Sequence, residues 1–358
     1  MSRQERSITK HIREHARRLE QKQITKQKEA TRPLPREHID AERWDEEEDE
    51  APKRGFKPAP ASVEKEVDLA EGQVIGLGPG VCKVLSASPD QDRIIVCRAE
   101  LEVVVGDRVG FTPQHQVRRI LPRSTTLSRP DPGNPNIERI IAANVEVVVI
   151  VVSVSAPALR PGLIDRYLIA IEKGGANPVL CVNKSDLVQS AADLAPLEPY
   201  RALGFPLFQC SVQTGDGVAD VRDALAGKFC VLVGHSGVGK SSLLNALAPG
   251  VNAVTGKISE AHLKGRHTTT SSRLYRLANG ARIIDTPGIR EFGLWDLQPG
   301  ELRAYFHEFD KFARGCTYSD CSHTHEPGCA VRGAVEAGLI AEARYSTYRN
   351  LLDGFGED

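Results

Sequence analysis

The chain has 358 residues, a length that suggests two or three domains. Its 46 Lys and Arg nearly balance its 47 Asp and Glu, and a pI near 6.8 argues against binding of nucleic acid through overall positive charge. Eight cysteines without a preceding secretory signal argue against a disulfide framework, and we expect a cytoplasmic protein.

Charge is unevenly distributed near the N-terminus. Residues 1–44 carry twelve Lys and Arg against seven Asp and Glu, and an acidic run follows at 45–50. Residues 52–60 then mix Pro, Lys and Gly. This composition predicts that residues 1–66 form a charged, mobile, partly helical arm rather than a domain. A solvated tail without a partner is an equally good interpretation.

Short apolar runs broken by turns fill residues 67–125. Six have the length of strands: 72–77, 81–85, 93–97, 101–105, 107–111 and 116–120. This spacing predicts a small β-barrel such as an OB-fold. Such barrels often bind nucleic acid, but Phe111 is the only aromatic residue in this stretch. Any RNA contact would therefore rely on backbone charge and shape, and the candidate residues are Arg118, Arg119, Arg123 and Arg129. The alternative is that these four arginines are ordinary surface charges.

Strands and helices alternate over residues 126–292. Val145–Val154 is a continuous apolar run, as expected of a strand that is buried on both faces. Pro161–Lys173 is predicted to be a helix, because Pro stands near its start and two glycines follow its end. Further strands are predicted near 178–183, 206–210, 229–233 and 281–285. The pattern predicts a mostly parallel sheet covered by helices, an α/β domain.

An apolar strand leads into Asn183-Lys184-Ser185-Asp186, the Asn-Lys-x-Asp pattern of guanine recognition. One carboxylate can accept hydrogen bonds from both N1–H and the N2 amine of guanine, whereas adenine would leave it unpaired. We therefore expect Asp186 to read the base, Asn183 to tie this loop to a phosphate loop, and Lys184 to pack its stem over the base. The stretch Ser211–Gly215 fits a loop behind the base, or equally an ordinary polar turn.

The strongest signal is Gly234-His-Ser-Gly-Val-Gly-Lys-Ser241, a complete G-x-x-x-x-G-K-S phosphate loop between an apolar run, 229–233, and a helical run, 242–248. Its glycines let backbone N–H groups turn toward phosphate oxygens, and the helix N-terminus adds partial positive charge. Lys240 is expected to reach the β- and γ-phosphates and Ser241 to ligate Mg²⁺.

Two further elements complete a GTPase set. Asp285-Thr-Pro-Gly288 matches the Asp-x-x-Gly element, with Asp285 holding Mg²⁺ through water and the Gly288 amide sensing the γ-phosphate. The first switch must lie within 265–270, where we choose Thr269 to complete the Mg²⁺ shell. A Ras-like GTPase begins with the phosphate loop, but here the base-reading elements come first. The order indicates a circular permutation, in which the sensor element runs directly into the C-terminal segment.

The expected reaction is hydrolysis of GTP to GDP and phosphate, with Lys240 and Mg²⁺ neutralising charge on the transferring group. Ras-like proteins place a water-orienting Gln directly after Asp-x-x-Gly, and this chain has Ile289 there. An aliphatic side chain cannot orient water, so intrinsic hydrolysis should be slow. His267 in the first switch is our candidate for this role, and contact with RNA or solvent is its alternative.

The C-terminal region, 293–358, contains a possible metal site. Cys316, Cys321, His323 and Cys329 lie in a short polar loop, and three thiolates with one imidazole are a standard tetrahedral zinc set. A complete set of four leaves no open position, so one structural zinc is expected. His325 is the rival ligand. The other five cysteines are scattered on predicted strands and are interpreted as small buried hydrophobic residues.

Together these motifs resemble the ribosome small subunit-dependent GTPase A (RsgA) family over residues 67–352. The resemblance rests on the Asn-Lys-x-Asp, phosphate-loop and Asp-x-x-Gly elements, on Gly265-Arg-His-Thr-Thr-Thr270, and on the Cys/His loop, all in permuted order. It implies an OB-fold, a permuted GTPase domain and a helical zinc domain. It also implies a factor for late maturation of the small (30S) ribosomal subunit, which binds that subunit and its rRNA and is stimulated by it.

We expect a monomer without membrane association. The predicted contacts to GTP or GDP come from Asn183, Lys184, Ser185, Asp186, Ser211, Gly234, His235, Ser236, Gly237, Val238, Gly239, Lys240, Ser241, Ser242, Asp285 and Gly288. An alternative is a GTP-regulated switch that binds another RNA or protein, with hydrolysis incidental. An ATPase is disfavoured by Asp186.

Overall fold

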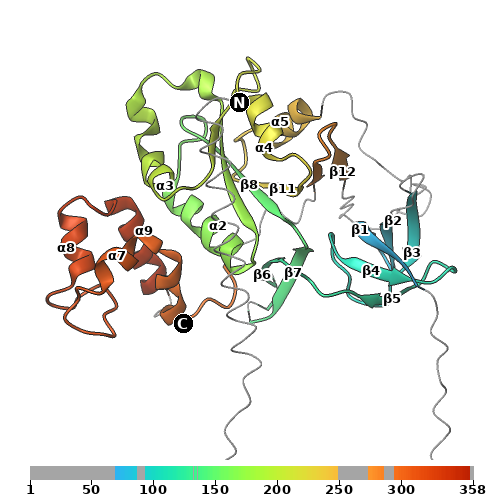
Figure 1. The fold of residues 1–358 in the computed structure, drawn as a ribbon, viewed down its shortest axis with the longest axis horizontal. Helices are drawn as coiled ribbons and strands as arrows, with labels where there is room; N and C mark the ends of the chain where they lie inside the picture. Colours follow the sequence, from blue (N-terminus) through green and yellow to red (C-terminus); the bar gives the residue numbers. More distant parts are fainter. Residues whose placement is uncertain are drawn as a thin grey trace, which may run out of the picture. The chain divides into compact units, whose positions relative to one another are not determined.

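The computed structural model describes residues 69–86, 93–131, 133–134, 136–248, 273–285 and 294–354. These residues belong to one compact unit, Leu69–Asp358, whose elements are labelled in Figure 1. The predicted arm, 1–66, lies outside the described residues. Among the residues that are described, no helix combines the length and the apolar character that crossing a membrane requires.

The first five strands form an antiparallel sheet in the order β3-β2-β1-β4-β5. They are β1 (Ala70–Gly78), β2 (Val81–Ser86), β3 (Arg93–Arg98), β4 (Arg108–Phe111) and β5 (Val117–Ile120). The two edges of this sheet meet where the backbone N–H of Arg98 donates to the carbonyl of His115 at 2.8 Å, beside a parallel bridge from Arg98 to Gln116. This closure makes the predicted small barrel, and its interior is filled by alternate side chains such as Val74, Val84 and Val109.

One strand prediction in the barrel is wrong. Residues 101–105 form no strand, and only Val105 makes an isolated bridge, to Ala142. The reason is a tight turn: the Asp107 carboxylate accepts a hydrogen bond from the backbone N–H of Val104 at 2.8 Å, and Gly106 has φ +93°. An apolar run that would suit a strand is thus held as a turn by a side-chain hydrogen bond.

The central sheet has the order β10-β9-β8-β11-β13-β12. All neighbours in it are parallel except β12, which is antiparallel to β13. Its strands are β8 (Val147–Ser153), β9 (Asn177–Asn183), β10 (Leu207–Gln209), β11 (Phe229–Val233), β12 (Arg273–Arg276) and β13 (Arg282–Asp285). The predicted α/β architecture with a mostly parallel sheet is confirmed, and parallel strands of this kind are buried on both faces.

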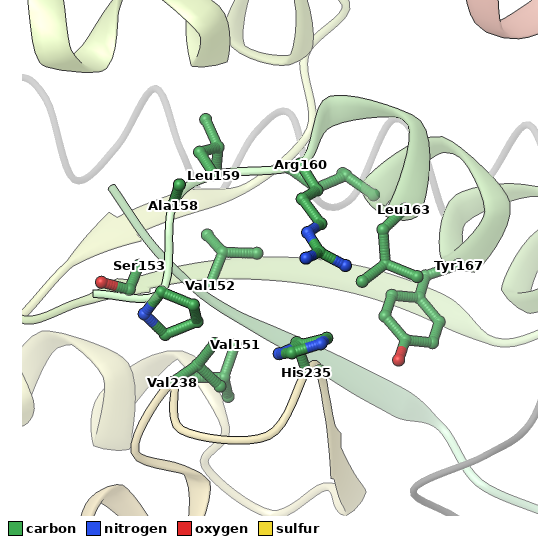
Figure 2. Close-up of a pocket in the computed structure, with 13 residues that line it drawn as sticks. Val151, Val152, Ser153, Ala158, Leu159, Arg160, Leu163, Tyr167, His235 and Val238 are labelled. Atoms are coloured by element: carbon green, nitrogen blue, oxygen red, sulfur yellow. The ribbon is translucent and has the colours of Figure 1, made fainter. Parts of the chain in front are cut away.

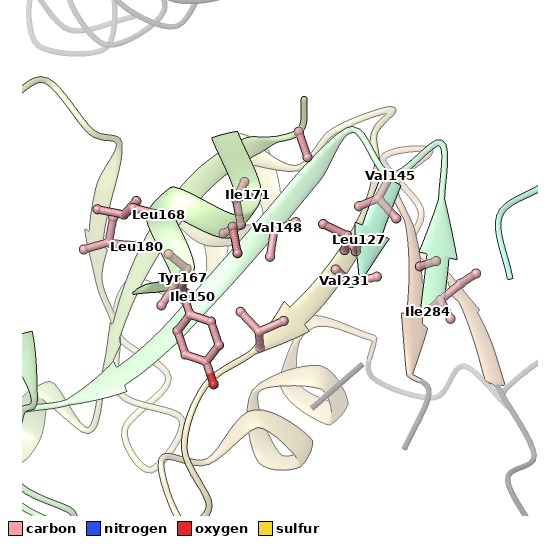
Figure 3. Close-up of a cluster of buried hydrophobic side chains, with 14 of the residues drawn as sticks. Leu127, Val145, Val148, Ile150, Tyr167, Leu168, Ile171, Leu180, Val231 and Ile284 are labelled. Atoms are coloured by element: carbon pink, nitrogen blue, oxygen red, sulfur yellow. The ribbon is translucent and has the colours of Figure 1, made fainter. Parts of the chain in front are cut away.

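Helices cover both faces of this sheet. They are α2 (Pro161–Lys173), α3 (Glu198–Ala202), α4 (Val218–Ala224) and α5 (Lys240–Leu247), with 3-10 turns η1 (Ser185–Leu187) and η2 (Ala191–Leu197). Strand β8 divides its side chains by alternation: Val148 and Ile150 enter the cluster that contains α2, shown in Figure 3, and Val149 enters the cluster that contains α4 and α5. The predicted helix 161–173 is confirmed at both ends.

A hairpin that sequence reasoning did not predict precedes the central sheet. Strands β6 (Thr126–Pro130) and β7 (Glu138–Ala143) pair antiparallel. Leu127 on β6 is fully buried and packs into the core beside Val145 and Val148. The residues between β6 and β7 are mostly turn formers, and they make the alternation of apolar and polar residues in the two strands hard to recognise in the sequence.

The C-terminal module is helical. It contains α6 (Pro299–Leu302), η5 (Arg303–Tyr305), η6 (His307–Phe309), α7 (Asp310–Ala313), α8 (Ala330–Glu336) and α9 (Glu342–Asp353). The core of the module includes Phe306, Phe309, Tyr345 and Tyr348, and also Ile169 from α2. The five scattered cysteines are buried as expected, and burial raises the pKa of Cys230 to about 12.

Arg123, one of the candidate RNA contacts, belongs to a buried ion pair. Its Nε and Nη2 donate to the two oxygens of Asp107 at 2.7 and 2.9 Å, and the Asp107 side chain is 0% exposed. We predict that Arg123→Ala lowers the free energy of unfolding by about 3 kcal/mol, because it leaves a buried carboxylate without its counter-charge. Arg118→Ala, at an exposed position of β5, should cost under about 0.5 kcal/mol. Urea titration of both variants measures the difference, and equal losses would contradict the assignment.

Candidate functional site

The predicted motifs meet at one edge of the central sheet. Strand β9 ends at Asn183, β11 leads into Gly234, and β13 ends at Asp285. Because these strands belong to one parallel sheet, their carboxyl ends lie at the same edge, where loops of α/β proteins bind ligands. Segments that are far apart in the sequence are thereby brought together.

The phosphate loop has a backbone that only glycine tolerates at several positions. Gly234, Gly237 and Gly239 have φ values of +138°, +84° and +93°. A Cβ atom on Gly234 would lie 2.1 Å from the carbonyl oxygen of Val151, and one on Gly239 would lie 2.3 Å from Nδ2 of Asn183. The loop therefore sits directly against β8 and the end of β9, and a side chain at either glycine would displace it.

Lys240 is the first residue of α5 and folds back over the loop. Its Nζ donates to the carbonyl oxygens of Gly234 and His235 at 2.7 and 2.8 Å. These bonds hold the ammonium group at the mouth of the loop, beside the N-terminus of α5. A positive charge at a helix N-terminus, with glycine-rich backbone around it, is an arrangement that attracts phosphate.

Asn183 makes the expected link between the base-reading segment and the phosphate loop. Its side chain is 2% exposed, and Nδ2 donates to the carbonyl oxygen of Val238 at 2.9 Å. Its Oδ1 accepts a hydrogen bond from the backbone N–H of Val212 at 3.4 Å. One buried amide thus joins three loops that the sequence separates, and a buried amide with both ends bonded resists displacement.

Asp186 and Ser211 come together across two loops. The Ser211 hydroxyl donates to Oδ1 of Asp186 at 2.5 Å and accepts from the backbone N–H of Thr214 at 3.2 Å. Ser211 is buried, whereas Asp186 is exposed. The carboxylate is therefore oriented from behind while it faces solvent. Lys184 has a left-handed backbone, φ +60°, and its Nζ donates to the carbonyl oxygen of Ala156.

A cavity that is partly open to solvent lies beside the phosphate loop, between the end of β8 and the start of α2. Figure 2 shows Arg160, Leu163 and Tyr167 on one side of it and His235 on the other. Gly234 lines the cavity together with Tyr167, and burial raises the pKa of the Tyr167 phenol. Sequence reasoning missed Tyr167, and a phenol within an otherwise apolar helix stripe is the signal that could have revealed it.

The remaining predicted residues are placed as follows. Ser185 begins η1, Ser236 is exposed on the phosphate loop, and Ser241 and Ser242 are exposed in the first turn of α5. Asp285 is described only as the last residue of β13. His267, Thr269 and Gly288 lie outside the described residues, as does Ile289.

Three thiols and one imidazole gather in the C-terminal module. The ligand atoms of Cys316, Cys321, His323 and Cys329 all lie within 4.8 Å of one another. Nδ1 of His323 is 3.5 Å from the sulfurs of both Cys316 and Cys329. His325, the rival ligand, is exposed and contacts Thr324 instead. The cluster can hold one metal ion, and a set of four Sγ and imidazole donors, three of them buried, suits a structural site.

Helix α9 supports the loop that carries these ligands. The Tyr345 hydroxyl donates to the carbonyl oxygen of His323 at 2.7 Å, and the Tyr348 hydroxyl donates to that of Ser322 at 2.8 Å. The His323 ring meets Phe309 edge to face, with centroids 5.8 Å apart. The two tyrosines therefore fix the loop that carries the Cys/His cluster.

Comparisons with known proteins agree with this geometry. The sequence model of a family described as RsgA GTPase matches residues 120–295. A small ribosomal subunit biogenesis GTPase RsgA from Gemmatimonas aurantiaca is 41% identical over 259 residues, covering 71% of this chain and 84% of that protein.

Two solved structures share the fold. YjeQ from Thermotoga maritima has a TM-score of 0.65 at 32% identity and covers 81% of this chain and 99% of its own. YloQ, described as a circularly permuted GTPase, has a TM-score of 0.64 at 29% identity and covers 81% and 96%. The rotated motif order thus has counterparts in solved structures.

The positions of His323, inside the cluster, and His325, outside it, yield a prediction. His323→Ala should lose the bound metal, because the imidazole that completes the cluster is removed, whereas His325→Ala should retain one metal ion per chain. Elemental analysis of both purified proteins, with a thiol titration, measures this. Metal loss in His325→Ala with retention in His323→Ala would reverse the ligand assignment.

Proposed function

The chain belongs to the RsgA GTPase family, and from this premise we propose that it hydrolyses GTP as an assembly factor of the small ribosomal subunit. The observation that carries the proposal is the convergence of a phosphate loop and a guanine-reading carboxylate at one sheet edge. Asn183 joins the two directly, through its bond to Val238. A nucleoside triphosphate and its base are then held by one rigid unit.

Selection of guanine rests on Asp186. Its Oδ1 is held by the Ser211 hydroxyl, and the carboxylate faces solvent at the end of β9. A carboxylate in a fixed orientation can accept from N1–H and the N2 amine together, which is the donor pair that adenine lacks. Lys184 is proposed to cover the base with its stem, and Ser185 and Ser211 to line the same pocket.

The phosphates are proposed to lie against the backbone of residues 234–239 and the N-terminus of α5. Lys240 would exchange its bonds to loop carbonyls for the β- and γ-phosphates. A hydroxyl and a carboxylate suit Mg²⁺, so Ser241, Asp285 and Thr269 would hold that ion, which neutralises phosphate charge when bound. His267 remains our proposal for positioning the attacking water, because Ile289 cannot do so.

The Cys/His cluster is proposed to hold one structural zinc. All four donors come from the protein and three of them are buried, so the set is complete without water. The loop that carries the four donors lies between α7 and α8. The ion would keep this loop folded, so that its carbonyl groups stay bonded to the two tyrosines of α9.

The proposed partner follows from the relatives, whose name states that they act in small ribosomal subunit biogenesis. We propose binding of that subunit through its rRNA, in the cytoplasm, by a monomer. A GTP-regulated switch with another RNA or protein partner is the alternative, and the barrel and metal module suit it equally.

The first test is GTP hydrolysis by the purified protein with and without purified small ribosomal subunits. We expect slow basal turnover, because no glutamine follows Asp-x-x-Gly, and at least a tenfold rise with the subunit. His267→Ala should keep GTP binding and lose the stimulated turnover. Tight GTP binding without stimulation by the subunit would favour the alternative partner, and full stimulation of His267→Ala would remove that residue from the mechanism.

A second prediction concerns the base. Asp186→Asn should reduce the preference for GTP over ATP by at least about tenfold, because a neutral amide cannot accept both guanine donors. The matched control is Asp223→Asn, at an exposed position of α4. Competition binding with GTP and ATP measures both variants, and unchanged selectivity in Asp186→Asn would refute its role as base reader.

A further inference from the structure

Helix α2 lies beside the phosphate loop with one face. Tyr167 on that face lines the same cavity as Gly234, the first residue of the loop. Leu163, one turn earlier on the same face, lines the same cavity as His235. Gly234 has no room to shift toward β8, because the carbonyl of Val151 closes that side. The position of α2 therefore helps to fix the entrance of the loop.

The other face of α2 contacts the C-terminal module. Asp165 is 0% exposed and accepts from Nη1 of Arg344 on α9 at 2.8 Å. Ile169, one turn further, belongs to the hydrophobic core of the module, and Glu172 meets His307 at 2.9 Å. Residues 165, 169 and 172 share one helix face, so the module packs along the length of α2.

Arg344 is the centre of this contact. Its side chain is 3% exposed, and its Nε and Nη2 donate to both oxygens of Glu308 at 2.7 and 3.0 Å. Its guanidinium also stacks on the Phe306 ring at 4.6 Å. Burial by itself would lower the pKa of Arg344, but the hydrogen bonds and negative charges of Glu308 and Asp165 have the larger effect, and the pKa is raised. A buried fork that bonds two carboxylates fixes α9 against α2 in one register.

The next residue of α9, Tyr345, donates to the carbonyl of the metal ligand His323. Contacts therefore run from the Cys/His loop through Arg344 to Asp165 on α2, and Tyr167 of the same helix lines the cavity beside Gly234. We propose that the C-terminal module sets the nucleotide affinity of the phosphate loop through helix α2, with the Arg344–Asp165 pair and Tyr167 as positioning groups. The inference rests on the proposed nucleotide site and adds a means by which a partner on the module regulates it.

The proposal is a coupling free energy, so it is reciprocal and can be measured. A partner that shifts α9 would move Tyr167 relative to Gly234 and weaken nucleotide binding. Bound nucleotide would in turn hold the module more firmly against α2. Groups more than 7–10 Å apart without shared partners normally act additively, so loss of additivity is the signature of the connection.

The experiment is a double-mutant cycle on the full chain, with GDP affinity as the readout. Tyr167→Phe removes only the hydroxyl. Arg344→Lys keeps the positive charge but removes the guanidinium that bonds to both Asp165 and Glu308. We expect each to weaken GDP binding about fivefold, the lower end of a typical coupling between two sites. The double variant should lie within twofold of either single variant, whereas independent effects would multiply. Arg349→Lys, an exposed position of α9, is the matched control and should leave the affinity unchanged.

Thermal melting of each variant separates coupling from simple destabilisation, because a purely structural role lowers the melting temperature without moving GDP affinity. If Arg344→Lys does not fold, Asp165→Asn replaces it in the cycle. Affinity of the Arg344 variant within twofold of wild type, or multiplicative losses in the double variant, would overturn the coupling and leave the proposed GTPase function standing. A wild-type chain that binds no GDP would refute both.

Discussion

The parallel pairing of β9, β8, β11 and β13 is the constraint on which the rest of the structure depends. These strands are almost wholly apolar, so the sheet must be covered on both faces, and helices from two directions meet that need. Parallel pairing also gathers the carboxyl ends of the strands, and with them the chemical groups, at a single edge. The order of the strands in space therefore defines the site, and the order of the motifs in the chain can rotate without altering it.

Because the site is assembled from distant segments, its precision depends on a few buried polar contacts. Asn183 is the main one, since both ends of its amide are bonded to neighbouring loops. Gly239 packs directly against that amide, which explains why the loop needs glycine there independently of any phosphate. The same residues thus satisfy a packing requirement and a chemical one, and the two requirements together produce the motif that the sequence displays.

The sequence predicted those parts of the molecule that local chemistry dictates. Residues 234–241, 183–186 and the four metal-cluster residues were found because phosphate, guanine and metal ions each demand particular side chains at fixed spacing. The turn at 101–105 was mispredicted because a hydrogen bond from Val104 to the nearby Asp107 carboxylate overrides its apolar pattern, and the hairpin β6–β7 was missed because tertiary packing decides it. Asp165 and Arg344 could not be found, since they meet only through the packing of α2 against α9.

The C-terminal module shows how a small helical unit can be made rigid. Several of its helices have a single turn, too short to be stable alone, and its aromatic core is compact. His323 adopts a left-handed backbone, φ +63°, which places its ring edge against Phe309 and its Nδ1 toward the thiols. The Cys/His loop is thus shaped partly by its packing against the aromatic core of the module, and its own residues complete that core. Helix α9 bonds to that loop through Tyr345 and to α2 through Arg344, so one helix connects the Cys/His loop to the helix that lines the cavity beside the phosphate loop.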